Sequence, residues 1–173
     1  MDKADLRCAL ERHHLESFGW ALACCGRDRV EAEDVLQASY LKILEGRARF
    51  DGRSSVKTWL FGVIRRTAAE ERRRSLLRLR VRQSQVTDTP RGVEQPGVDA
   101  IDDAQRSAAL LRAIATLAPR QREVVQLVFY HGMTIEDAAI VMRVSLGTAR
   151  THYERGKERL RARLRAPLHE RTR

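Results

Sequence analysis

The chain has 173 residues, of which 33 are basic and 23 acidic, giving a formal net charge of +10. It holds no signal-peptide core and no apolar run near the roughly 18 residues that span a bilayer, so we expect a cytoplasmic protein without membrane insertion. The charge lies in blocks of −2 over residues 1–48, +8 over 49–82, −4 over 83–104 and +8 over 105–173. Two basic blocks around an acidic spacer favour two contact surfaces for a polyanion over one diffuse cationic coat.

Apolar residues recur at helical spacing along the chain, and no alternating pattern typical of strands is present. The sequence therefore predicts an all-α fold. Residues 83–104 combine both central prolines and several acids without helical periodicity, which indicates a flexible acidic linker. The linker would join two small helical domains, residues 1–82 and 105–173, each able to bury only a modest core.

The three cysteines, Cys8, Cys24 and Cys25, do not form a metal-binding pattern, because two are adjacent and no second cluster exists. The neighbouring His13 and His14 leave zinc as an alternative, which we weigh below ordinary thiols in a reducing cytosol. No nucleophile, base and orienting residue occur at a recognisable spacing, and no glycine-rich phosphate loop is present. We therefore expect no metal, no cofactor and no enzymatic activity.

The segment of residues 31–46 has two distinct faces on a helical wheel. Its inward arc holds Ala32, Val35, Leu36, Ser39, Tyr40 and Ile43. Its outward arc holds Asp34, Gln37, Leu41 and Leu44. Leucines beside Asp and Gln on an outward arc indicate a surface that docks another protein, although exposed leucines are also common without such a role.

Residues 49–55 are predicted to form a loop, because Asp51 and Gly52 favour a turn, and a helix is expected to begin near residues 54–55. The inward residues of this helix should be Trp59, Leu60, Val63, Ile64 and Thr67. Its outward residues should be Thr58, Phe61, Gly62, Arg65, Ala69 and Arg72. A basic loop carrying Phe50 ahead of a basic helix is suited to holding phosphates and trapping unstacked bases, whereas Phe50 and Trp59 taken singly favour the core.

The stretch of residues 117–160 describes two short helices around a tight turn, followed by a basic helix. Thr134 is suited to cap the first helix of the turn, whose apolar stripe is Ile135, Ala138, Ala139 and Met142. Arg143 and Val144 form the turn, and Ser145 can cap the next helix. The inward stripe of that helix is Leu146, Ala149, Tyr153, Gly156 and Leu160. The cap, the turn and a small residue at the crossing predict a helix-turn-helix, which reads DNA.

The opposite face of this last helix carries charged and hydroxyl side chains, namely Thr148, Arg150, Thr151, Glu154, Arg155 and Lys157. In a major groove Arg is suited to a bidentate contact with guanine, Thr to bases or the thymine methyl, and Glu to the cytosine amino group. Arg and Glu at helical spacing are more often an ordinary solvated face. The cap, the turn and the small crossing residue together favour DNA reading here.

Taken together, these segments resemble the extracytoplasmic-function sigma factors of bacterial RNA polymerase. The segment RDRVEAEDVLQASYLKIL, followed by RFDGRSSVKTWLFGVIRRTAAEERRR, is similar to sigma region 2. The later segment LAPRQREVVQLVFYHGMTIEDAAIVMRVSLGTARTHYERGKERLRARL is similar to sigma region 4. The order of the two matches and the short acidic spacer between them make the resemblance specific, and it covers most of the chain.

The resemblance implies a dissociable subunit that directs promoter-specific initiation, with core RNA polymerase and promoter DNA as partners and an anti-sigma factor as a further candidate. The polymerase clamp would be bound by Asp34, Gln37 and Leu41. The minus-ten element would be opened and read by Phe50, Arg53, Ser55, Lys57, Arg65 and Arg66. The minus-35 major groove would be read by Thr148, Arg150, Thr151, Glu154 and Arg155. All phosphodiester chemistry would belong to polymerase.

The chain departs from the family pattern at several positions, among them Ala38 after the docking Gln, Gly62 and Arg66 in the minus-ten helix, and Arg143 at the turn. The minus-ten sequence preference therefore does not carry over from the family. The main alternative is a stand-alone helix-turn-helix regulator, whose N-terminal module binds a ligand or a second copy and which binds duplex DNA unaided. A non-specific nucleic-acid packaging protein would leave the acidic spacer and the organised turn unexplained.

Overall fold

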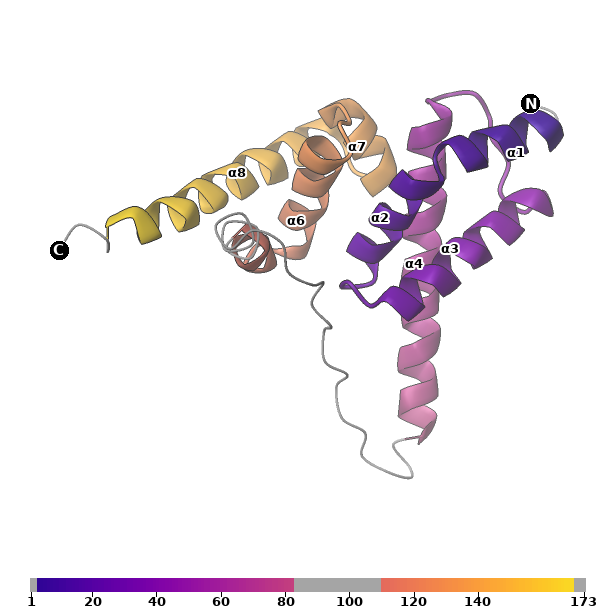
Figure 1. Ribbon diagram of the computed structural model, residues 1–173, viewed down its shortest axis with the longest axis horizontal. Helices are drawn as coiled ribbons and strands as arrows, with labels where there is room; N and C mark the ends of the chain where they lie inside the picture. Colours follow the sequence, from indigo (N-terminus) through magenta and orange to yellow (C-terminus); the bar gives the residue numbers. More distant parts are fainter. Residues whose placement is uncertain (1–2, 83–109, 170–173) are drawn as a thin grey trace, which may run out of the picture. The chain divides into compact units, whose positions relative to one another are not determined.

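The computed structural model describes the backbone of residues 3–82 and 110–169, which belong to two compact helical units (Figure 1). The first unit contains α1 (Lys3–Arg12), α2 (His14–Cys24), α3 (Arg29–Leu44) and α4 (Val56–Arg82). The second contains a short helix over residues 110–115, α6 (Pro119–Val125), the π-helix η1 (Gln126–Tyr130), α7 (Ile135–Met142) and α8 (Leu146–His169). The described residues contain no strand, which confirms the all-α prediction for them. The predicted linker, residues 83–104, lies outside this description.

In the first unit α2 and α3 both pack against α4, and two aromatic rings lie at the centre of the core. Trp20 of α2 stacks on Phe61 of α4, with ring centroids 5.7 Å apart and planes inclined by 5°. The indole Nε1 of Trp20 also donates a hydrogen bond of 3.0 Å to the carbonyl oxygen of Phe61. The polar atom of this buried ring is therefore satisfied, and the pair ties α2 to α4.

The predicted inward face of α4 is correct, and the predicted outward face is correct at Arg72 but wrong at Thr58 and Phe61. Leu60, Val63, Ile64 and Thr67 are buried as predicted, and Trp59 is half-buried. Thr58 and Phe61, expected to point outward, are also buried. The prediction assumed one buried stripe, whereas α4 lies against two helices and so buries a wider arc in its first turns.

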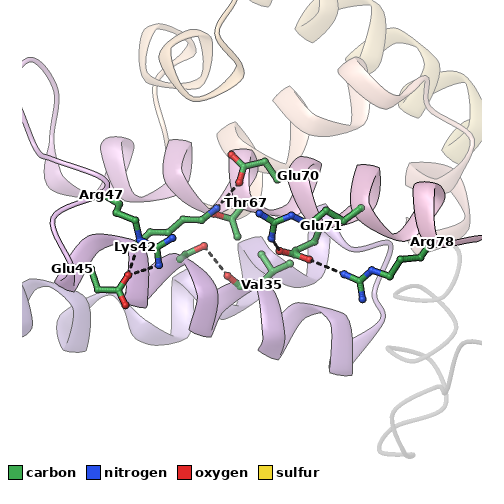
Figure 2. A network of polar contacts seen from close by, with 10 residues as sticks. Val35, Lys42, Glu45, Arg47, Thr67, Glu70, Glu71 and Arg78 are labelled. Atoms are coloured by element: carbon green, nitrogen blue, oxygen red, sulfur yellow. Dashed lines mark hydrogen bonds and ion pairs between the residues drawn. The ribbon is translucent and has the colours of Figure 1, made fainter.

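Polar contacts of Lys42 join the last turn of α3 to the middle of α4 (Figure 2). The ammonium of Lys42 donates to the Glu70 carboxylate at 2.6 Å and to the Thr67 hydroxyl at 3.1 Å. The hydrogen bond from Lys42 lowers the pKa of the Glu70 carboxyl below its ordinary value. Lys42 is largely covered, so its aliphatic stem packs between the helices while its charge is paired.

In the second unit α8 packs against both α6 and α7. The crossing with α6 is close enough that a Cβ on Gly156 would lie 2.9 Å from Cγ2 of Val125, which explains a glycine at this inward position. Arg122 of α6 donates to the carbonyl oxygens of Ile114, Ala115 and Leu117 at distances of 3.2, 2.6 and 3.2 Å. Arg122 thereby caps the preceding short helix and attaches it to α6.

The helix-turn-helix predicted from the sequence is formed by α7 and α8, and both predicted caps are present. Thr134 accepts a hydrogen bond of 3.0 Å from the Asp137 amide, and Ser145 accepts one of 3.2 Å from the Thr148 amide. Ala149, Gly156 and Leu160 are buried and Tyr153 is half-buried, as the predicted inward stripe requires. Leu146, the first residue of α8, is the exception at 38% exposed.

The turn between α7 and α8 places an arginine in a conformation that normally favours glycine. Arg143 has φ 55° and ψ 51°, the left-handed region. The amide of Val144 donates to the Ala139 carbonyl at 3.1 Å, and the amide of Arg143 to Ile140 at 3.2 Å. This is the Schellman arrangement of a helix end, so the turn forms without glycine at a steric cost of roughly 1–2 kcal/mol.

Candidate docking and nucleic-acid surfaces

One face of α3 presents the three residues predicted to dock another protein. Asp34, Gln37 and Leu41 follow one another at spacings of three and four residues, and all are exposed. Leu41 is 54% exposed and Leu44, one turn further along, is 42% exposed. The opposite arc is buried at Ala32, Val35, Leu36, Ser39 and Ile43, with Tyr40 half-buried. The α3 face therefore offers apolar area beside a carboxylate and an amide, the composition expected of a docking surface.

The loop between α3 and α4 carries Phe50, whose ring packs against the ring of Trp59 on α4. The Phe50 and Trp59 rings meet edge to face with centroids 5.4 Å apart. Nε1 of Trp59 donates a hydrogen bond of 3.1 Å to the Arg49 carbonyl, which holds the loop against the start of α4. Both rings are half-buried, so they belong neither to the closed core nor to the fully exposed surface. Phe50 and Trp59 are therefore packed against each other and still partly accessible to solvent.

Arg53 and Ser55 of the same loop differ in the contacts that their side chains make within the unit. The Arg53 side chain is 89% exposed, and its guanidinium lies 3.6 Å from the Asp51 carboxylate. Ser55 caps α4, because its hydroxyl accepts from the Thr58 amide at 3.1 Å and bonds the Thr58 hydroxyl at 2.7 Å. Arg53 is thus presented to solvent, whereas the Ser55 hydroxyl is used in starting the helix.

The three residues of α4 predicted to contact the minus-ten element, Lys57, Arg65 and Arg66, are only half-exposed. The ammonium of Lys57 donates to the Glu16 carboxylate of α2 at 2.7 Å, and this hydrogen bond lowers the pKa of the Glu16 carboxyl. Arg65 and Arg66 are half-buried, and both make contacts within the chain. A nucleic acid would have to compete with Glu16 for Lys57, while the arginines lie on the helix that also forms the core.

On α8, every residue predicted to read a major groove is exposed: Thr148, Arg150, Thr151, Glu154 and Arg155. They span about two helical turns next to the motif's turn. Lys157, expected beside them, is half-buried. Its ammonium pairs with Glu154 at 2.7 Å and lies 5.0 Å from the centre of the Tyr153 ring. The exposed face of α8 therefore carries charged and hydroxyl side chains, as predicted. Lys157 is the one predicted member that is not fully exposed.

The side chains on this face differ in how firmly they are held. The Thr151 hydroxyl donates to the Gly147 carbonyl at 2.9 Å. Nη2 of Arg150 lies 3.5 Å from Oε1 of Glu136, on α7. Arg155, in contrast, makes no side-chain hydrogen bond or ion pair with any residue that the structure describes. The face therefore combines side chains that have partners with one, Arg155, that has none among the described residues.

Two features of the second unit escaped the sequence reasoning. Glu136 and Arg150 are 14 residues apart on different helices, so no helical spacing reveals their contact. Phe129 and Tyr130 are 61% and 77% exposed, and Phe129 stacks on Tyr153 with centroids 5.7 Å apart. The segment QLVFY has the apolar run of a core element, and the wider turn of the π-helix η1 decides where its aromatic rings lie.

The cysteines are free thiols in different surroundings. Cys25 is buried, and burial raises the pKa of its thiol to about 12, which keeps it protonated near neutral pH. Cys8 is exposed and Cys24 half-buried. Across residues 3–82 and 110–169 no three metal-ligating side chains come together. No helix within the described ranges is long and apolar enough to cross a membrane.

Two protein-family models match the chain over most of the described helices. Sigma-70 region 2 matches residues 10–76, which include α2, α3 and the loop with Phe50. Sigma-70 region 4 matches residues 107–160, which include α6, α7 and the exposed face of α8. All three candidate surfaces, the α3 face, the α3–α4 loop with the start of α4, and the exposed face of α8, therefore fall inside the matched segments.

Comparison with individual proteins gives the same result. The ECF RNA polymerase sigma factor SigX of Bacillus subtilis is 30% identical over 139 residues, covering 78% of this chain and 71% of SigX. The RNA polymerase sigma factor CarQ of Myxococcus xanthus is 30% identical over 142 residues, covering 81% of this chain and 78% of CarQ.

Two solved structures share the fold. The sigma factor RpoE of Bartonella quintana, crystallised with the anti-sigma factor NepR, matches with a TM-score of 0.70 at 22% identity, covering 93% of this chain and 97% of RpoE. CnrH, in complex with the cytosolic domain of CnrY, matches with a TM-score of 0.64 at 19% identity, covering 95% of this chain and 90% of CnrH.

Proposed function

Because this chain belongs to the extracytoplasmic-function sigma factors of bacterial RNA polymerase, we propose that it uses three separate surfaces to direct initiation at particular promoters. Proteins of this family are transcription initiation factors. The first surface is the exposed face of α3, the second is the α3–α4 loop with α4, and the third is the exposed face of α8. The protein supplies recognition, and the phosphodiester chemistry belongs to polymerase, so we do not propose an enzymatic activity.

The α3 face docks core polymerase in this proposal. Leu41 would supply apolar area that is buried on binding, and Asp34 and Gln37 would fix the orientation of the partner through hydrogen bonds. The support is their shared exposure on a helix whose other arc is buried in the core. Leu44 extends the same apolar surface by one turn.

The loop and α4 open and read the minus-ten element. The half-buried Phe50 ring offers a stacking surface for an unpaired base, and the exposed Arg53 can hold the phosphate next to it. Arg65 and Arg66 would hold the displaced strand along α4. Ser55 and Lys57 would contribute from the helix start, Lys57 only after exchanging Glu16 for a phosphate.

The exposed face of α8 reads the minus-35 element in the major groove. The second helix of a helix-turn-helix contacts base edges with its N-terminal residues, which places Thr148, Arg150 and Thr151 nearest the bases. Glu154 and Arg155 lie one turn further along the same face. The support is the exposure of all five residues on a helix with a capped start.

We also propose that an anti-sigma protein holds this sigma factor inactive and that the protein works in the cytoplasm with polymerase. The support is that two proteins sharing its fold have solved structures in complexes: RpoE with an anti-sigma factor, and CnrH with the cytosolic domain of CnrY.

The observation that carries the proposal is the presence of both sigma segments in one chain, each folded into its own unit with its candidate face exposed. The test is promoter binding and transcription by the purified full chain, with and without core polymerase. We expect weak duplex binding by the free chain and specific initiation once polymerase is added. Tight specific duplex binding without any polymerase association would instead favour a stand-alone regulator.

The docking surface is tested by replacing Asp34, Gln37 and Leu41 together by Ala. Because truncating interface hot spots costs about 2 kcal/mol or more, core polymerase should bind more than about tenfold more weakly. Ala favours helix, so the variant should keep its circular dichroism spectrum. Leu15→Ala removes a leucine that is 85% exposed on α2 and serves as the matched control. Undiminished polymerase binding by the folded triple variant would contradict the assignment.

A further inference from the structure

The helix-turn-helix contains an ion pair that ties its DNA-facing helix to the helix before it. Nη2 of Arg150 on α8 lies 3.5 Å from Oε1 of Glu136, in the first turn of α7. The side chains are 62% and 57% exposed, so water screens the pair and it adds little to the stability of the unit. The pair instead restricts the positions that the Arg150 guanidinium can take.

This restraint leaves Arg150 able to bind a base. A guanidinium carries five N–H donors in a planar fork, and Glu136 engages one terminal nitrogen only. A bidentate contact with guanine uses two donors, directed at O6 and N7. The remaining donors suffice for that contact while Glu136 stays in place. A side chain that is oriented before binding loses less rotamer freedom when it binds.

The negative charge of Glu136 is unfavourable for binding DNA in general, so its presence points to a role in specificity. Glu136 brings a negative charge next to the helix that would face DNA phosphates, which lowers affinity for every sequence. Arg155, four residues after Thr151 on the same exposed face, has no such partner among the described residues. The two arginines of the reading face therefore differ: Arg150 has a partner that orients it before DNA binds, whereas Arg155 has none that the structure describes, so the cost in affinity that Glu136 imposes is matched by a gain in the placement of Arg150 alone.

We propose that Glu136 is a positioning residue for Arg150 and sharpens discrimination at one base pair of the minus-35 element. The inference rests on the proposed base reading by Arg150. It adds that a residue of α7, and not only residues of α8, sets the promoter preference of this sigma factor.

The test is initiation by the full chain with core polymerase across a library of minus-35 sequences at two salt concentrations. Glu136→Asp keeps the charge and shortens the reach by one methylene, so it removes the contact without changing the field. A good arginine–guanine pair discriminates against the wrong base by about 5- to 150-fold. Glu136→Asp should reduce that discrimination several-fold at the base pair that Arg150→Ala also affects, with the salt dependence unchanged.

Two more variants separate orientation from charge. Glu136→Gln keeps the side chain's length and removes its charge, so it should weaken discrimination and raise the affinity for all sequences. Glu158→Gln removes a carboxylate from an exposed position of α8 that makes no contact with Arg150, and it should leave discrimination unchanged. In an Arg150→Ala background, neither Glu136 variant should alter base preference further.

The possible failures are distinguishable. If Arg150→Ala relaxes one base pair and both Glu136 variants retain the full preference there, the positioning role is wrong while base reading stands. If Arg150→Ala leaves every base preference intact, base reading by Arg150 is wrong, and the positioning role fails with it.

Discussion

The two units of the molecule place their aromatic residues in opposite ways. In the first unit Trp20 and Phe61 stack inside the core, where α4 is covered by two helices. In the second unit Phe129 and Tyr130 are exposed at the end of η1, and Phe129 stacks on Tyr153. The candidate DNA residues of the first unit therefore lie on elements that also build its core, whereas those of the second lie on a helix face that its core does not use.

This difference extends to individual polar side chains. Ser55 caps α4, and Lys57 is paired with Glu16, so the same groups serve folding and the proposed DNA contact. Arg150 and Arg155 extend from the exposed face of α8 and are not needed for packing. Substitutions in the first unit should therefore mix effects on stability and recognition, while those on α8 should change recognition alone.

Phe61→Ala should have the largest effect and would test the contrast most directly. Removing a fully buried ring beside Trp20 leaves a cavity, so the free energy of unfolding of the first unit should fall by about 3–5 kcal/mol. Urea unfolding followed by tryptophan fluorescence reports on this unit, because Trp20 and Trp59 are the chain's two tryptophans. Phe129→Ala, measured by circular dichroism, should cost about 1 kcal/mol, the scale of one surface aromatic pair. Equal losses of unfolding free energy in the two variants would contradict this difference between the two units.

Arg150→Ala should weaken binding by about 1–3 kcal/mol at particular minus-35 base pairs without changing the stability of the second unit. The matched control is Arg163→Ala, which removes an exposed charge further along α8 and should weaken all sequences alike, with a smaller salt slope. Binding across a minus-35 library at two salt concentrations distinguishes the two. If Arg150→Ala altered only the salt dependence, its assignment to base reading would be incorrect.

Replacing Arg65 and Arg66 together by Ala sharpens the comparison within the first unit. If these residues hold the opened strand, transcription from duplex promoters should fall roughly tenfold, or about 1.4 kcal/mol, relative to templates already unpaired at the minus-ten element. Both arginines are half-buried, so the unfolding curve of the variant must be measured as well. An equal loss on both templates would indicate a defect in folding or docking.

Glu70→Gln should have the smallest effect, at most about 1 kcal/mol, because the Glu70 side chain is 46% exposed and water screens its pair with Lys42. The hydrogen bond from Lys42 lowers the pKa of Glu70 in the folded unit below the ordinary value of 4.5. The pair therefore stabilises the unit at pH values well above 4.5, and this contribution is lost as the pH falls through the lowered pKa. Urea unfolding between about pH 7 and about pH 3 should show a flatter pH dependence for Glu70→Gln than for the wild type. Parallel curves would exclude this contribution.

The amino-acid sequence was sufficient for those features that depend on neighbours a few residues away. The caps at Thr134 and Ser145 join a side chain to an amide three residues later, so residue type and position predict them. The exposed stripe of Asp34, Gln37 and Leu41 follows from helical periodicity in the same way. The family could also be recognised, because both motifs occur in order and at the expected separation.

Only the tertiary structure decided which helices meet, and with that the features that periodicity cannot supply. Thr58 and Phe61 are buried because α2 and α3 both pack against α4, whereas Leu146 is 38% exposed although it belongs to the predicted inward stripe of α8. The pairs of Lys57 with Glu16 and of Arg150 with Glu136 join residues 41 and 14 positions apart on different helices. Hydrogen bonds and periodicity within a helix act over a few residues, whereas burial and ion pairing between helices depend on how the whole unit packs.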